Sequence, residues 1–133
     1  MSTVIERLTE AQNDHDAVRL SACFAVDYRS EQPAHPARAF TGRAQVLANW
    51  TAVFAGVPDF RAEIRSTCRV GDVEWGELAW RGHHVDGSPF AMCGVIVAEV
   101  RDDLIASARL YFEPVERDSD IEASVARLYR PPR

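Results

Sequence analysis

The sequence contains no lysine: all 15 of its basic side chains are arginines, against 20 acidic ones, and the formal net charge is −5. Because nucleic-acid binding needs a clustered basic surface, this balance argues against a nucleic-acid partner. Long hydrophobic runs are also missing, since no stretch approaches the ~18 apolar residues of a membrane span. The first ten residues, MSTVIERLTE, carry charges where a signal peptide has an apolar run. We therefore expect no membrane partner.

Cysteine is scarce, and its pattern favours free thiols. Cys23, Cys68 and Cys93 are odd in number, widely spread and set among apolar neighbours, as expected of buried, reduced thiols in a cytoplasmic protein. No spacing of Cys, His and Asp matches a zinc site, and the adjacent His83 and His84 would point to opposite faces of a strand. No glycine-rich phosphate loop precedes a helix. The sequence therefore predicts no metal and no cofactor.

The first half of the chain has helical periodicity. Thr3 and Glu6 form a capping-box pattern at the start of a first helix, and a second helix is expected to begin at Asp14 or Asp16. An extended piece, Tyr28 to Gln32, precedes Pro33. A third helix begins at Thr41-Gly42 and ends at Pro58. The apolar positions expected to face inward are Val4, Ile5, Leu8 and Ala11, then Ala17, Leu20, Ala22 and Phe24, then Val46, Leu47, Trp50, Val53, Phe54 and Val57.

The second half of the sequence has a pattern that predicts β-strands. Four β-type segments, at about 60–70, 73–85, 89–100 and 104–113, are separated by Gly71-Asp72, Asp86-Gly87 and Asp102-Asp103. Helices followed by antiparallel strands predict an α+β fold, a cone-shaped α+β barrel in which three N-terminal helices pack on a strongly curved, mostly antiparallel sheet. We expect a single domain over 1–133, with its core at 4–115, a tail at 116–133 that frays at the final RPPR, and a small-ligand pocket in the cone.

The residues that resemble a known family lie in three strings: NDHDAVRLSACFAVDYRSEQP, FTGRAQVLANW and CGVIVAEVRDDLIASARLYFEP. They are similar to the helix–helix–strand opening, the third helix and the last hairpin of the nuclear-transport-factor-2-like superfamily. The nearest group is the SnoaL-like polyketide cyclases and ketosteroid isomerase-like proteins. The resemblance implies the cone fold and a homodimer through the outer sheet face. It implies no single activity, because the superfamily holds cyclases, isomerases, epoxide hydrolases, dehydratases and non-enzymatic binders.

The residues of the two best-understood mechanisms in this superfamily are missing here. A ketosteroid isomerase resembling this chain would place its base at Gln32, an amide that takes no proton at neutral pH, and its oxyanion-hole pair near Leu8 and Val95. A limonene-epoxide-hydrolase-like site would fall on Leu78, Trp80 and Leu110. SnoaL-like cyclases use a late carboxylate, for which Glu113 is the candidate. Glu113 faces away if its neighbour Phe112 faces the pocket, and the alternative for it is a structural pairing with Arg109 or a neighbouring strand.

Strand alternation assigns side chains to two faces of the sheet. The more apolar set is assigned to the concave pocket side and comprises Leu78, Trp80, Gly82, His84, Cys93, Val95, Val97, Ala108, Leu110 and Phe112. The outer set comprises Trp75, Glu77, Ala79, Arg81, His83, Arg109, Tyr111 and Glu113. This amphipathic outer face is either exposed to solvent or forms the dimer interface that the resemblance implies.

The candidate catalytic residues are His35, Gln32 and His84. His35 is the proposed base near neutral pH, while Gln32 would bind a carbonyl and His84 would point into the cone. The alternatives are a surface histidine, a loop amide bonded to backbone and a strand-end histidine near solvent. Arg38 and Arg43 would suit an anionic ligand, or are solvated or salt-bridged. The expected substrate-binding wall is Trp50, Trp80, Leu78, Val95, Leu110 and Phe112, of which the two tryptophans alternatively belong to the core.

Two functions from different classes follow. The first is a cofactor-free isomerase or cyclase that transfers a proton on a small hydrophobic or ring-bearing metabolite. The alternative is a non-catalytic protein of the same shape, which either binds a small ligand or serves as a dimerising accessory protein. The sequence does not choose between them, because His35 is the only side chain it offers as a base.

Overall fold

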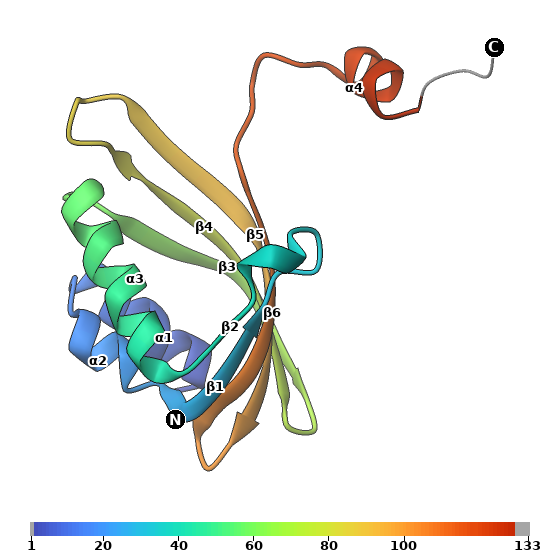
Figure 1. Ribbon diagram of the computed structural model, residues 1–133. Coiled ribbons are helices and arrows are strands. Elements are labelled where there is room, and N and C mark those ends of the chain that lie inside the picture. The colour runs from blue at the N-terminus through green and yellow to red at the C-terminus, as the bar shows by residue number, and fades with distance from the viewer. Residues whose placement is uncertain (1, 130–133) are drawn as a thin grey trace.

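The computed structural model describes residues 2–129 as three helices packed on one face of a curved six-stranded sheet (Figure 1). The strands lie in the order β2-β1-β6-β5-β4-β3, and the sheet is not closed into a barrel. β1 runs parallel to β6, and the other neighbouring pairs are antiparallel. The α+β prediction is therefore confirmed. The elements are α1 (Val4–Asn13), α2 (Ala17–Ser21), β1 (Phe24–Glu31), the 3₁₀ turn η1 (Pro36–Arg38), β2 (Phe40–Thr41), α3 (Arg43–Gly56), β3 (Arg61–Val70), β4 (Val73–His83), β5 (Pro89–Arg101), β6 (Leu104–Pro114) and α4 (Ile121–Leu128).

The first helix follows its predicted cap. Thr3 is the N-cap of α1, and its side chain accepts a hydrogen bond from the Glu6 backbone N–H at 3.1 Å. The second helix is shorter than predicted, because the backbone turns into β1 soon after Ser21. The Cys23 carbonyl accepts a hydrogen bond from the Ile105 N–H at 2.9 Å, which draws the chain into the sheet. Phe24 is therefore a strand residue, and Ala22, expected to face inward, is exposed.

Helix α3 crosses the concave face as its apolar stripe predicts. Gly42 is its N-cap, with φ 106°, a left-handed conformation that favours glycine. Val46 is buried, and Trp50 and Phe54 pack against the core between helix and sheet. The boundaries of β3 to β6 agree with the sequence to within about two residues, whereas β1 begins four residues before the predicted extended piece. The turn residues Gly71, Gly87, Asp102 and Asp103 all have positive φ. This hairpin series fixes which side chains face α3.

The C-terminal segment forms a structure that the sequence analysis did not anticipate. Helix α4 lies within the expected tail and is capped by Asp120, whose side chain accepts from the Ala123 N–H at 2.9 Å. Figure 1 shows it away from the body of helices and sheet. The RPPR end lies outside the described residues. Among residues 2–129, none of the helices has the length and apolar character that a membrane crossing requires.

Candidate functional site

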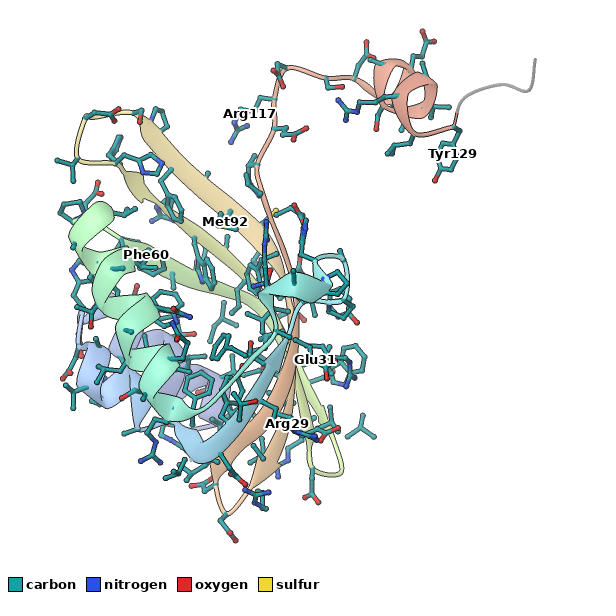
Figure 2. The ribbon with its side chains drawn as sticks, in the orientation of Figure 1. Arg29, Glu31, Phe60, Met92, Arg117 and Tyr129 are labelled. Carbon is teal, nitrogen blue, oxygen red and sulfur yellow. The ribbon has the colours of Figure 1, made fainter. Side chains whose placement is uncertain are left out.

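A cavity of about 220 Å³ lies between the helices and the concave face of the sheet. Its floor comes from α1, one wall from α3 and the opposite wall from β4, β5 and β6, while β1 and the 32–39 connection form the remaining side. Figure 2 shows how densely side chains fill the space between α3 and the sheet. The lining residues are Leu8, Gln12, Phe24, Tyr28, Ser30, Gln32, Arg38, Phe40, Val46, Asn49, Trp50, Val53, Leu78, Trp80, Met92, Ile96, Leu110 and Phe112.

Stacked aromatic rings build the sheet wall of this cavity. Trp80 and Phe112 lie with ring centroids 4.3 Å apart and an interplanar angle of 9°, and Trp50 meets Trp80 edge-on at 5.3 Å and 85°. Leu78 and Leu110 line the same wall. Five of the six side chains predicted to form the substrate-binding wall therefore do line the cavity. Their contact with a ligand stays a prediction.

Strand β5 presents the opposite face from the one predicted. Leu78 pairs with Gly94 and Trp80 with Met92, so the even-numbered β5 residues share the cavity face, and Met92 and Ile96 line the cavity. Val95 instead lies on the outer face, where it borders a shallow depression with Trp75 and Glu77. The prediction that Val95, Cys93 and Val97 face the cavity was wrong. Because β5 is apolar on both faces, the alternation of its side chains does not indicate which face lies inside.

His35 lies outside the cavity. Its Nε2–H donates to Glu113 Oε1 at 2.7 Å, and the two side chains are 36% and 60% exposed. Glu113 faces away from the cavity, as the position of Phe112 predicts, and its partner is His35 rather than Arg109. The expectation that His35 borders the pocket is therefore wrong, because its imidazole is held by the carboxylate on the other side of β6.

His84 does not line the cavity either. It is exposed in the β4–β5 turn, where its backbone N–H bonds to the Ser88 carbonyl and its ring lies edge-on to Phe90 at a centroid distance of 5.6 Å. The prediction assumed that β4 continues to residue 85, but the strand ends at His83. His83 Nδ1 lies 2.7 Å from Asp59 Oδ2, and this contact lowers the pKa of that aspartate.

Gln32 is the one predicted catalytic residue that reaches the cavity. Its Oε1 accepts a hydrogen bond from Arg38 Nη1 at 3.0 Å, and both side chains line the cavity where it meets solvent. Asn49 of α3 borders the same opening, with its Oδ1 bonded to Gln45 Nε2 at 2.7 Å. Since Gln32 is half-buried while Arg38 and Asn49 are exposed, these three residues form the mouth.

Two polar side chains of β1 that lie inside the cavity were missed from the sequence. Tyr28 and Ser30 on β1 are 2% and 4% exposed, and both line the cavity together with Gln32. The signal was present in the sequence, because positions 28, 30 and 32 share one face of a strand. Burial raises the pKa of Tyr28 to about 12, although a hydrogen bond with Ser30 acts in the opposite direction. The phenol is therefore a neutral hydrogen-bond donor at physiological pH.

The raised pKa of Tyr28 predicts a loss of stability in alkali. Because the folded protein holds this proton more tightly than the unfolded chain, the stabilisation is complete below pH 10 and is lost as the pH rises through about 12. The full loss is about 3 kcal/mol. Urea unfolding of Tyr28→Phe and of the unchanged protein between these pH values measures it. We expect a shallower decline in the variant, and equal declines would contradict the assignment.

Two buried polar side-chain atoms belong to residues that line the cavity. Gln12 Oε1 and Trp80 Nε1 are both buried, and neither has a hydrogen-bond partner within the described part of the chain. A buried polar group without a partner costs about 1–3 kcal/mol.

The cavity holds few ionisable groups. Of the described residues that line it, none is Asp, Glu or His, and Arg38 is the single one with a formal charge. Residues 2–129 also contain no cluster of three His, Cys, Asp or Glu side chains suited to a metal ion. The chemistry that this arrangement offers is hydrogen bonding from phenol, amide and guanidinium groups beside an aromatic wall.

Known structures share this architecture. A candidate polyketide cyclase from Streptomyces antibioticus, IdmH, is 25% identical, with a TM-score of 0.72 over 83% of this chain and 89% of that one. A Catenulispora acidiphila protein with a ketosteroid isomerase-like fold, solved with trimethylamine, is 21% identical, with a TM-score of 0.72 over 94% and 92% of the two chains. A candidate isomerase from Bacillus subtilis is 17% identical, with a TM-score of 0.73 over 83% and 84%.

Comparison with curated protein sequences gave no match. The family model of the SnoaL-like domain, in contrast, matches residues 5–108. This span includes nearly all of the three helices packed on the sheet and most of the sheet itself, and it agrees with the resemblance found in the sequence. The chain therefore belongs to the SnoaL-like domain family.

Proposed function

We propose that this protein binds a small ring-bearing molecule inside the cavity, with the ring against Trp80 and Phe112. The observation that carries the proposal is the aromatic wall beside a cavity of about 220 Å³. A cavity of roughly 150 Å³ accommodates benzene, whereas drug-sized ligands occupy about 300–1,000 Å³. The size supports a ligand of one or two rings.

The lining favours binding over proton transfer. A general acid or base needs a pKa near the operating pH, and the described lining offers Tyr28, whose pKa is about 12, and an arginine. His35, the base expected from the sequence, is bonded to Glu113 outside the cavity. The polyketide cyclase and isomerase relatives support a ring-bearing ligand, and turnover of such a ligand is the alternative outcome.

Calorimetric titration with 2-naphthol tests the proposal. We expect saturable binding at one site, and we expect Leu110→Trp to weaken it at least about tenfold, equivalent to about 1.4 kcal/mol, because the larger ring fills the cavity. Tyr111→Trp is the matched control, since this neighbour lies on the outer face and is 45% exposed. Absence of binding, or equal affinity in Leu110→Trp and the control, would refute the proposal.

The homodimer through the outer sheet face is a further proposal. Trp75 and Tyr111 on this face are 41% and 45% exposed, and Val95, paired with Tyr111, adds apolar surface between them. Exposed aromatic side chains of this kind are common in protein interfaces. Sedimentation equilibrium distinguishes the dimer from a monomer of 14.8 kDa.

A further inference from the structure

We infer that the ligand carries a carboxylate, which binds at the mouth to Arg38 while the ring occupies the apolar interior. The inference rests on the proposed function and adds the chemical class of the ligand, a small aromatic or alicyclic carboxylic acid. It depends on three observations at the mouth, which concern its charge, its hydrogen-bond donors and its position relative to the apolar wall.

The charge at the mouth is opposite to that of the chain. The protein has a formal net charge of −5, yet Arg38 is the single charged side chain among the described lining residues. Within residues 2–129, no carboxylate forms an ion pair with Arg38. An arginine at the entrance of an apolar cavity, with no ion-paired carboxylate among the described residues, has its charge available for a ligand.

The hydrogen-bonding groups at the mouth are predominantly donors. Gln32 must turn its oxygen toward Arg38, because a guanidinium donates and never accepts, and this contact occupies Gln32 Oε1 at 3.0 Å. The Asn49 oxygen is likewise occupied by Gln45 Nε2. The amide NH₂ groups of Gln32 and Asn49 make no hydrogen bond to the described residues, so they remain available beside the guanidinium. A mouth whose amide oxygens each already accept one hydrogen bond, and whose N–H groups make none to the described residues, matches an acceptor-only group.

A carboxylate meets these conditions better than a ketone or a hydroxyl does. A carboxylate supplies one negative charge to pair with the positive charge of Arg38, and both of its oxygens can accept hydrogen bonds from the planar guanidinium. A hydroxyl would add a donor where donors are already in excess. Behind the mouth, most of the lining side chains are apolar, Leu8 and Phe112 among them, and they exclude water from the rest of the ligand. The site therefore suits a molecule with a charged end and a ring.

Two probes of equal shape test the inference: 2-naphthoate and its neutral analogue 2-naphthamide, titrated calorimetrically into the full chain. We expect about tenfold tighter binding of the carboxylate, with a preference that weakens as the salt concentration rises. In Arg38→Met the preference should fall to about one, because the naphthoate affinity falls more than the naphthamide affinity. Since Arg38 is exposed, the variant should keep its unfolding temperature.

Arg65→Met is the control, because Arg65 is an exposed residue of β3 that does not line the cavity and its loss changes the net charge equally. This variant should keep the preference for naphthoate. Binding of naphthamide without a preference for naphthoate, or a preference that survives in Arg38→Met, would overturn the carboxylate assignment alone. Failure of both probes to bind the unchanged protein would overturn the proposed function as well.

Discussion

Replacing Gly94 by alanine should lower the free energy of unfolding by about 3 kcal/mol or more. A Cβ at this position would clash with the Tyr111 carbonyl oxygen and would lie 2.7 Å from Phe112 Cα. Both are backbone atoms of β6, so the contact cannot be relieved by rotating a side chain. The adjoining strands must separate instead, and they carry Leu78 and Phe112 of the cavity wall, which are the direct partners of Gly94.

Urea unfolding followed by circular dichroism measures this effect, and Gly56→Ala provides the control. Gly56 ends α3, and no atom lies within 4 Å of a Cβ placed there, so alanine should be neutral or slightly stabilising at this position. If Gly94→Ala unfolds at the same urea concentration as Gly56→Ala, the close approach of β5 and β6 does not hold in solution.

Much of the fold was predictable because its local signals are strong. The apolar stripe of α3 recurs with helical spacing over three turns, and the strands are separated by residues that tolerate positive φ, as Gly71, Gly87 and Asp102 do here. The missed elements are short or depend on distant partners. β2 has two residues, and it exists because it pairs with β1 at Arg29 and Ser30. No local sequence pattern predicts such an element.

The sequence predicted most of the cavity wall and the mouth residues Gln32 and Arg38, but it did not predict the polar groups inside the cavity. Large apolar side chains on α3, β4 and β6 had a single face to occupy, so Trp50, Trp80 and Phe112 were placed correctly. The sequence could not predict which face of β5 lines the cavity, because a strand that is apolar on both sides gives the same pattern in either register. The position of His35 depends on the path of the 32–39 connection, which is fixed by long-range contacts with β6 such as the one to Glu113.

The substitution Glu74→Ala should also cost about 3 kcal/mol, and it should loosen the floor of the cavity. Glu74 is 2% exposed, and its oxygens accept hydrogen bonds from the backbone N–H groups of Ile5 at 3.3 Å and Val4 at 3.5 Å. Arg69 Nη1 donates to the same carboxylate at 3.2 Å. The carboxylate therefore joins the N-terminus of α1 to the β3–β4 hairpin, where a negative charge is favoured by the unpaired N–H groups of the helix.

The functional consequence of Glu74→Ala follows from what α1 carries. Leu8 and Gln12 form the floor of the cavity, so a helix freed at its N-terminus widens the site as well as weakening the fold. Glu74→Gln is the matched variant, because it keeps one acceptor oxygen and loses the charge, and we expect it to lose about half as much stability. Hydrogen exchange should show faster exchange of the α1 amides in Glu74→Ala than in Glu74→Gln. Equal exchange in α1 for both variants and the unchanged protein would mean that packing of Ile5 and Leu8 alone holds the helix, and that the buried carboxylate has no part in shaping the cavity.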